Sequence, residues 1–411
     1  MEFLDVLKKY RDNSFSKSDL GTKFEELMAR YLMTDPLYAT RFQWVRLWRD
    51  FHARAEMGGH DTGIDLVAKT KENEYWAIQC KFYSEEHRVN KSDMDTFLAA
   101  SGRTFHDEDG NMTSFSQRMV IATTDNWGVN ASDVATGQTI PVIMLGLEII
   151  RNAPVRWDEI EEGAHGESAM EEKHVLRDHQ KEAVENALKH YKDHDRGSMI
   201  MACGTGKTFT SLGIVEALME REGKTKGCIL FLAPSISLIG QTLREWIYNS
   251  KQGLNPICVC SDPKVSKKHT DDDLGERVED LGMPATTDPV KIVSQYNSSS
   301  DTAVIFSTYQ SIDSVIEAQR SGLPIFDIII CDEAHRTTGA IIGGQEESYF
   351  TKVHSNDNVK AKKRLYMTAT PRIYGVKGKE DASKASVALC SMDDESIYGA
   401  EFYKRGVFID R

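Results

Sequence analysis

The chain has 411 residues, of which 40% are apolar and 27% charged, values typical of a globular protein with two or three domains. No apolar run approaches the roughly 20 residues of a membrane span, and the charged N-terminus lacks a signal-peptide core, so we expect a cytoplasmic protein without membrane contact. Seven cysteines without a Cys-x-x-Cys pair argue against a disulfide framework or a zinc site. The net charge of −13 argues against a wholly basic nucleic-acid binder but leaves a local basic groove open.

The first part of the chain is expected to place an amphipathic helix ahead of a β-hairpin. Apolar residues recur at helical spacing in TKFEELMARYLM, residues 22–33. Residues 64–68 and 75–82 read as two strands joined by the charged turn KTKENE. Because side chains alternate along a strand, Gln79 and Lys81 share one face of the second strand, and Asp65 lies on its partner.

An acid, an oxygen ligand and a lysine two residues later form the layout of a Mg²⁺-dependent phosphodiesterase. Asp65 and the side-chain oxygen of Gln79 would hold the metal, which activates water and neutralises charge developing on a phosphate. Lys81 would orient the water or stabilise the transition state.

This stretch resembles the Mrr-like branch of the PD-(D/E)xK restriction-nuclease fold, in which GID is followed by QxK. The resemblance implies a mixed sheet flanked by helices, over roughly residues 20–150, and includes MVIATTDNW, a helix near residues 131–135 and IPVIMLGLEII. It also implies that a glutamate on the first helix completes the site, which assigns Glu25, with Glu26 as the weaker alternative and Asp61 as an accessory acid. A nuclease-like fold that binds DNA without cutting it stays open as the alternative, because Gln79 is uncharged.

A phosphate-binding loop is predicted at MACGTGKT, residues 201–208, between an apolar strand and a helix. Gly204 and Gly206 let the backbone curl so that successive N–H groups of the loop, Thr205 included, face phosphate oxygens. The helix N-terminus adds its positive end, Lys207 supplies a charge for the terminal phosphates, and Thr208 a hydroxyl ligand for Mg²⁺. We therefore predict ATP and Mg²⁺ as cofactors of this half.

A second motif supports the nucleotide site. The sequence DIIICDEA, residues 327–334, reads as an apolar strand that ends in two acids. Asp332 would hold Mg²⁺ through water, and Glu333 would polarise the attacking water.

The order of these motifs resembles superfamily 2 helicases, whose motor lobes are RecA-like parallel α/β domains. The resemblance assigns Gln180 to recognition of the adenine edge, His335 to the continuation of the acidic motif in DEAHRTTG, and Thr368 and Thr370, in RLYMTATPRIYG, to coupling of nucleotide state with strand binding. Pro234, Ser235 and Gln241 would lie near the nucleic-acid backbone. Residues 261–301 are expected to form a polar surface insert with a short helix.

The wording DEAHRTTG plus MTATPRIYG resembles the translocases of restriction enzymes, and an Mrr-like nuclease ahead of such a motor resembles the Type ISP restriction-modification enzymes. We therefore predict a nuclease domain at 1–150, a linker at 151–173, a first motor lobe at 174–385 and, at 386–411, the start of a connection to a second lobe. The predicted function is a metal-dependent endonuclease coupled to an ATP-driven translocase of double-stranded DNA.

The resemblance implies further partners, namely a second RecA-like lobe, a methyltransferase and a target-recognition domain. The chain holds no methyltransferase motif such as NPPY, so we expect it to be part of a longer enzyme in which one lobe alone hydrolyses ATP poorly. Two alternatives remain. The first is a DNA-binding module that does not cut DNA, attached to an ATP-driven remodeller. The second is a helicase, acting on DNA or RNA, with an unrelated amino-terminal interaction domain.

Overall fold

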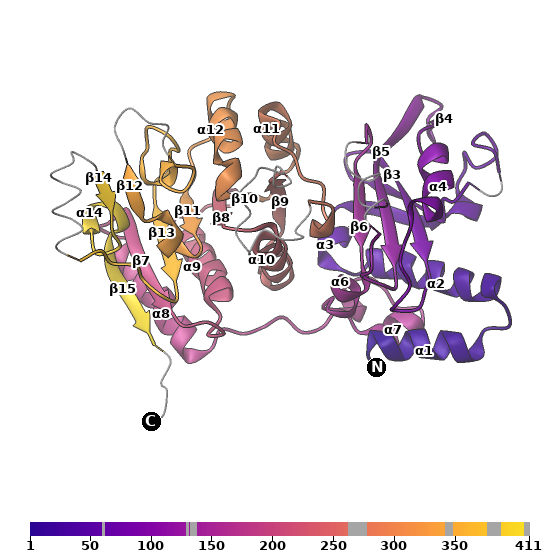
Figure 1. Cartoon of the computed structure of the whole chain (residues 1–411), viewed down its shortest axis with the longest axis horizontal. Helices are drawn as coiled ribbons and strands as arrows, with labels where there is room; N and C mark the ends of the chain where they lie inside the picture. The colour runs from indigo at the N-terminus through magenta and orange to yellow at the C-terminus, as the bar shows by residue number, and fades with distance from the viewer. Residues whose placement is uncertain are drawn as a thin grey trace. The chain divides into compact units, whose positions relative to one another are not determined.

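The computed structural model describes residues 1–59, 62–128, 131, 138–261, 278–341, 348–375 and 388–406. The chain divides into two compact units (Figure 1). The first unit is Met1–Lys173 with Glu279–Pro284, and the second is His174–Val278 with Ala285–Arg411. Within the described residues, no helix combines the length and the apolar character that a membrane crossing requires.

The first unit contains a six-stranded mixed sheet in the order β1-β2-β3-β5-β4, with β6 paired to β5. β2 is antiparallel to β1 and β3, whereas β5 is parallel to β3 and β6 and antiparallel to β4. Its strands are β1 (Phe42–Leu47), β2 (Leu66–Thr70), β3 (Tyr75–Lys81), β4 (Thr104–His106), β5 (Met112–Ala122) and β6 (Val142–Leu145). Its helices are α1 (Phe3–Asn13), α2 (Lys17–Leu32), α3 (Pro36–Ala39), α4 (Asp95–Ala100), α6 (Leu147–Arg151) and α7 (Trp157–Glu161).

Helix α2 forms where helical periodicity predicts it but begins five residues earlier. The Ser16 side chain accepts a hydrogen bond from the Asp19 N–H, which satisfies an end group that the helix leaves unpaired and sets the start of the helix. Phe24, Leu27 and Met28 are buried, as the pattern predicts. The hairpin is also confirmed, although its first strand begins at Leu66 rather than at residue 64.

The second unit is built on a seven-stranded parallel sheet in the order β15-β7-β13-β11-β8-β10-β9. Its strands are β7 (Arg196–Met201), β8 (Cys228–Ala233), β9 (Leu254–Val259), β10 (Thr302–Thr308), β11 (Ile328–Cys331), β13 (Arg364–Thr368) and β15 (Ala400–Arg405); β12 (Gly339–Ile341) and β14 (Ala388–Cys390) form a separate antiparallel pair. Its helices are α8 (Asp178–His190), α9 (Lys207–Arg221), α10 (Ile236–Asn249), α11 (Pro289–Ser298), α12 (Ile312–Arg320) and α14 (Glu395–Tyr398).

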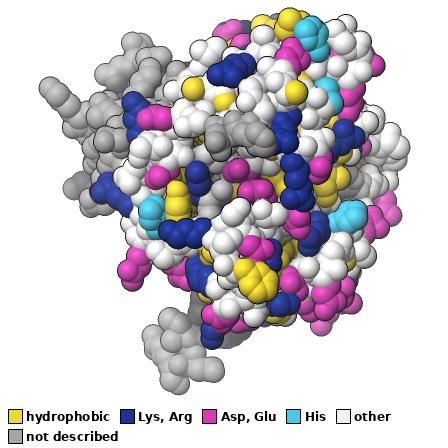
Figure 2. Space-filling model, turned by 90° about the vertical axis from the view of Figure 1, so that its right-hand side faces the viewer, with side chains coloured by type: hydrophobic (Ala, Val, Ile, Leu, Met, Phe, Trp, Pro, Cys, Tyr) yellow, Lys and Arg dark blue, Asp and Glu magenta, His cyan; other side chains and the backbone are white. Residues whose placement is uncertain are grey.

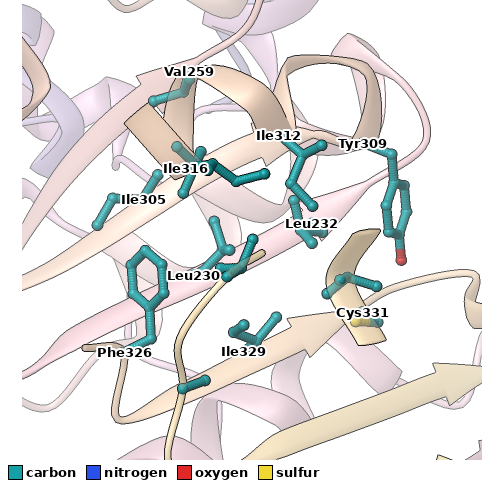
Figure 3. Packing of buried hydrophobic residues seen from close by; sticks show 14 of the residues in the cluster. Leu230, Leu232, Val259, Ile305, Tyr309, Ile312, Ile316, Phe326, Ile329 and Cys331 are labelled. Atoms are coloured by element: carbon teal, nitrogen blue, oxygen red, sulfur yellow. The ribbon is translucent and has the colours of Figure 1, made fainter. Parts of the chain in front are cut away.

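The core of the second unit lies between the sheet and its helices. Ile229, Leu230, Phe231 and Leu232 run consecutively and are all buried, as expected of a strand covered on both faces. Figure 3 shows Leu230 and Leu232 of β8 facing Ile312 and Ile316 of α12. This packing fixes the carboxyl ends of the strands, where parallel α/β sheets bind their ligands.

The structure differs from the sequence-based domain boundaries at two places. Residues 151–173, expected to be a linker, belong to the first unit, because Trp157 packs against Phe3 and Tyr31 with ring centroids 4.4 and 5.3 Å apart. Residues 400–405, expected to begin a connection to another lobe, form β15 and extend the sheet of the second unit beside β7. Such segments look like linkers in the sequence because most of their residues are polar or acidic. Their few apolar side chains determine where they pack.

Three sequence-based expectations fall wholly or largely on residues outside the described ranges. They are Asp61 as an accessory acid, the helix near 131–135 apart from Ala131, and most of the first half of the insert at 261–301. The described part of the insert contains α11, whose N-terminus is capped by the Asp288 side chain accepting the Val290 N–H.

Candidate functional site

In the first unit, the hairpin brings Asp65 beside the end of β3. The Asp65 N–H donates to the Ile78 carbonyl at 2.9 Å, and the Cys80 N–H donates to Asp65 Oδ2 at 2.7 Å. The carboxylate is therefore anchored to the β3 backbone midway between Gln79 and Lys81 in sequence. The Lys81 and Glu25 charges both act on the carboxyl of Asp65, so the structure brings these three predicted residues together.

Gln79 is 2% exposed and offers one unsatisfied oxygen. Its Nε2 donates to the Gly63 carbonyl at 3.1 Å, and because that carbonyl can only accept, the amide orientation is fixed with Oε1 on the other side. Within the described residues, Gln79 Oε1 is buried and has no hydrogen-bond partner. A buried acceptor without a donor is costly, and a cation would satisfy it.

Gly63 makes this orientation possible. Its φ of 69° lies in the left-handed region, and a Cβ there would lie 3.2 Å from Gln79 Nε2 and 3.0 Å from the Phe97 nitrogen. The glycine of the GID pattern thus has a steric reason that the sequence alone does not reveal.

The electrostatics of the site favour a bound cation. Burial, supported by the neighbouring Glu25, raises the pKa of Asp65 to about 7, against the opposing effects of the Cys80 N–H and of Lys81. Burial also raises the pKa of Glu25, which Arg49 partly offsets. Two carboxyls that resist ionisation, together with the free oxygen of Gln79, fit the oxygen donors that Mg²⁺ takes. No group of three or more His, Cys, Asp or Glu side chains suited to a metal occurs in the described part of the chain.

The two glutamates considered for the first helix have different surroundings. Glu26 pairs with Arg49 at 2.8 Å and with Arg30 at 3.7 Å, which commits its carboxylate to surface ion pairs. The charge of Glu25 instead helps to raise the pKa of Asp65. The structure therefore favours Glu25 as the acid that faces the site.

The raised pKa of Asp65 predicts a pH-dependent gain in stability for Asp65→Asn in the presence of a chelator. Folding disfavours the charged carboxylate, so this cost is absent near pH 4 and complete above about pH 7. Asn keeps the acceptor for the Cys80 N–H, and we expect the variant to be more stable than the wild type by about 1–3 kcal/mol at pH 8, with the difference fading toward pH 5. Urea unfolding at both pH values measures it.

Asp107→Asn is the matched control for this measurement. Hydrogen bonds from the Asn111 N–H and its neighbours lower the pKa of Asp107, so the same substitution there should destabilise the fold at pH 8. An Asp65→Asn effect that is equal at pH 5 and pH 8 would contradict the environment described for Asp65.

In the second unit, the predicted phosphate loop lies between β7 and α9. Gly204 and Gly206 have φ values of 75° and 84°, which is the left-handed backbone that a curled loop requires. A Cβ on Gly206 would overlap the amide nitrogen of Gln180. Lys207 and Thr208 open α9, so the loop precedes the N-terminus of a helix of fifteen residues, as predicted.

The acidic pair lies opposite this loop. Asp332 follows β11 directly, and burial, together with the charge of Glu333, raises its pKa to about 6. Glu333 adopts a φ of 46°, a strained conformation for a residue with a side chain. Its Oε1 lies 4.0 Å from Lys207 Nζ, so the structure brings both motifs to one place.

His335 joins this cluster to the strand that follows. Its Nδ1 lies 3.4 Å from Glu333 Oε2 and 2.9 Å from Thr368 Oγ1, and Thr368 Oγ1 accepts the Thr370 N–H at 3.2 Å. Burial lowers the pKa of His335, with Glu333 opposing. His335 of DEAHRTTG and the two threonines of RLYMTATPRIYG, which the helicase resemblance singled out, thus form one connected set.

Gln180 contacts the phosphate loop rather than an open pocket. Its Nε2 lies 3.3 Å from the Gly206 carbonyl, and its Oε1 accepts the Arg177 N–H at 2.8 Å. Reading an adenine edge would require it to exchange these bonds.

Sequence reasoning missed His179, Trp246 and His354. His179 Nε2 lies 3.0 Å from the Thr205 carbonyl, and the buried Trp246 donates its indole N–H to the Thr208 carbonyl at 3.1 Å. No motif marks these residues, and only their placement in the fold reveals them.

Two family models match the chain: the Mrr_cat_2 restriction endonucleases over residues 33–167, and the res subunit of Type III restriction enzymes over residues 173–373. The chain is similar to the ATP-dependent Type ISP restriction-modification enzyme LlaBIII, whose structure was solved bound to DNA. The two sequences are 37% identical, the alignment covers 99% of this chain and 25% of the LlaBIII chain, and the TM-score is 0.77. A nuclease-deletion mutant of the Type ISP enzyme LlaGI, in complex with a DNA substrate mimic, is 42% identical over 57% of this chain and 20% of its own, with a TM-score of 0.44. No curated protein gives a significant match.

The chain thus spans about a quarter of the length of LlaBIII. Both predicted halves, the Mrr-like nuclease and the helicase-like lobe, are confirmed by separate family models and by one structure that aligns along nearly the whole chain. On this evidence the chain belongs to the Type ISP restriction-modification enzymes.

Proposed function

We propose that the chain is the nuclease and first motor lobe of an enzyme that cuts DNA in a metal-dependent reaction and moves along double-stranded DNA by ATP hydrolysis. The observation that carries the nuclease half is the buried, unpartnered Oε1 of Gln79 beside the anchored carboxylate of Asp65. An oxygen that lacks a donor, next to a carboxyl that resists ionisation, is an arrangement that a bound cation would stabilise.

Each residue of the nuclease half has a distinct part. Asp65 and Gln79 would hold Mg²⁺, which when bound supplies charge neutralisation at the scissile phosphate. Lys81 would orient the attacking water or stabilise charge on the phosphate, and Glu25 would complete the acidic side of the site. The Cys80 N–H keeps the Asp65 carboxylate in position throughout.

In the motor half, the loop amides of residues 204–206 and Lys207 would bind the phosphates of ATP. Thr208 and Asp332 would hold Mg²⁺, Glu333 would orient water, and Gln180 would read adenine after releasing the Gly206 carbonyl. His335, which contacts both side chains, would couple the position of Glu333 to that of Thr368. A second RecA-like lobe, a methyltransferase and a target-recognition domain are proposed as further parts of the complete enzyme, since LlaBIII is about four times as long.

Double-stranded DNA is the proposed partner, and LlaBIII in the aligned structure is itself bound to DNA. Figure 2 shows one face of the molecule on which Lys and Arg side chains are interleaved with Asp and Glu, without a single broad basic patch. The mixed charges on this face agree with the net charge of −13.

Nicking of supercoiled plasmid tests the nuclease half. The chain at high concentration should nick DNA in Mg²⁺ or Mn²⁺ and stop when a chelator is added. Gln79→Leu removes the oxygen and should lower nicking at least about tenfold, whereas Gln79→Glu supplies a charged oxygen at the same place and should retain it.

Two results would count against this assignment. Nicking that is equal in Gln79→Leu and the wild type would remove Gln79 from the site. Salt-sensitive DNA binding without any nicking, in this chain and in the complete enzyme, would favour a DNA-binding module that does not cut.

A further inference from the structure

Behind the nucleotide site, a buried histidine connects two segments of the second unit. His354 closes a short helical turn at residues 352–354 and is only 9% exposed. Its ring Nε2 lies 3.0 Å from the Thr337 carbonyl, and its Nδ1 lies 3.0 Å from the Tyr366 hydroxyl. Because a carbonyl can only accept, Nε2 carries the proton, and Nδ1 accepts from the Tyr366 O–H. Both ring nitrogens are therefore used.

Thr337 passes this connection on to the acidic motif. Its hydroxyl donates to the Ala334 carbonyl at 2.7 Å and lies 3.1 Å from the Tyr398 hydroxyl, which must then be the donor. Thr337 ends the turn at residues 334–337 that begins directly after Glu333. The His354 ring and the Tyr398 hydroxyl thus hold the far end of the turn whose near end carries the strained Glu333.

The backbone around His354 is itself anchored to the sheet. The Arg196 guanidinium on β7 donates to the His354 carbonyl at 2.8 Å and to the Ile397 carbonyl at 2.9 Å. Arg364, fully buried on β13, donates to the Val353 carbonyl at 2.8 Å. The histidine is therefore held in place by groups from two neighbouring strands.

The result is a closed ring of contacts between the acidic motif and β13. On one side, His335 meets Thr368, and the His335 side chain is 30% exposed. On the other side, His354 joins Thr337 to Tyr366, two residues before Thr368 on the same strand, and this side is buried. The His335 contact is therefore partly open to solvent, whereas the His354 contacts are buried.

The His354 ring is neutral in this setting. Burial lowers its pKa to about 4, the positive charges of Arg196 and Arg364 act in the same direction, and only the Thr337 carbonyl opposes them. The Tyr366 and Tyr398 rings lie beside the His354 ring, with centroids 5.6 and 5.0 Å away and interplanar angles of 38° and 69°. A neutral ring keeps one proton at one nitrogen, which is the state that the hydrogen bonds require.

We propose that His354 is a positioning residue of the ATP site, which holds the turn at residues 334–337 against β13 so that Glu333 and His335 keep their places. The proposal rests on the ATPase role assigned to this lobe. His354 acts only through Thr337 and Tyr366 and is not expected to touch the nucleotide.

Two amide substitutions separate the two bonds of the ring. Gln reaches the position of Nε2 and can still donate to the Thr337 carbonyl, whereas Asn reaches only the position of Nδ1 and keeps the contact with Tyr366. In the complete enzyme, His354→Asn should lower kcat for DNA-stimulated ATP hydrolysis by about tenfold or more with KM for ATP within about threefold, and His354→Gln should restore most of kcat.

Hydrogen exchange on this chain provides the second readout. Peptides that contain residues 333–338 should exchange faster in His354→Asn than in the wild type, and His354→Gln should restore their protection. Equal exchange and equal kcat in the Asn and Gln variants would overturn the proposal, because a residue that only fills space would not distinguish them. Exchange that follows the prediction in an enzyme without ATPase activity would instead refute the proposed function and leave the hydrogen-bonding role intact.

Discussion

Asp65→Asn is expected to reduce metal-dependent DNA cleavage by roughly three orders of magnitude, because it removes one negative charge from the proposed cation site while leaving its shape unchanged. The Asn side chain keeps an acceptor for the Cys80 N–H, so the hairpin should stay folded. Cleavage is measured as the rate of plasmid nicking over a range of Mg²⁺ and Mn²⁺ concentrations. High concentrations of metal should rescue the variant only in part, since the substitution also removes the carboxylate proposed to place the metal.

Asp107→Asn serves as the control for this loss of charge. Asp107 lies in the turn between β4 and β5, at the end of β5 far from Ala122, the partner of Lys81 in the sheet. The Asp107→Asn variant should nick DNA at the wild-type rate. Wild-type nicking in Asp65→Asn would exclude Asp65 as a metal ligand, and an equal loss in both variants would point to a general effect of losing an acidic side chain.

Lys207→Ala should lower ATP hydrolysis and translocation in the complete enzyme by about a hundredfold or more. The side chain lies beside the acidic pair, at 4.0 Å from Glu333, and its removal leaves the terminal phosphates without a compensating charge. Glu333 keeps its contact with His335 at 3.4 Å, so the motif should remain ordered. DNA-stimulated phosphate release and displacement of a triplex-forming strand measure the two activities.

The nuclease half provides the internal control for Lys207→Ala. Metal binding at the site proposed for Asp65 and Gln79 should be unchanged, because the two sites belong to different units. Lys291→Ala on α11, an exposed lysine of a helix that packs on the edge strand β9, should leave both activities intact. Retained translocation in Lys207→Ala would refute the role given to this lysine.

The sequence predicts those parts of the two sites that local patterns determine. Strand alternation places Gln79 and Lys81 on one face, and the strand–loop–helix pattern locates Lys207 and Thr208 at a helix N-terminus. It does not predict which atoms hold these residues. The Cys80 N–H reaches Asp65 because of the register between the two strands of the hairpin. The Gly63 carbonyl orients Gln79 because Gly63 has a positive φ, which the sequence does not specify.

Long-range contacts explain the remaining misses. His354 has no neighbouring motif, and its meaning comes from Thr337 and Tyr366, which a folded sheet brings to either side of it. Trp157 sits in an acidic stretch that reads as a linker, yet its ring determines where that stretch docks. Strand β15 pairs with β7 across about two hundred residues, a pairing that neither strand signals by itself.

The pairing of β15 with β7 has a mechanical consequence. The two strands run parallel from Gly197 to Met201, and one further hydrogen bond joins the Ala202 N–H to the Arg405 carbonyl at 3.1 Å, at the first residue after β7. Tension applied along β15 would load these bonds together, in shear, rather than one after another. Arg405 is thereby tethered to β7, the strand that precedes the predicted phosphate loop. A pulling force applied at Arg405 would therefore act on β7 directly.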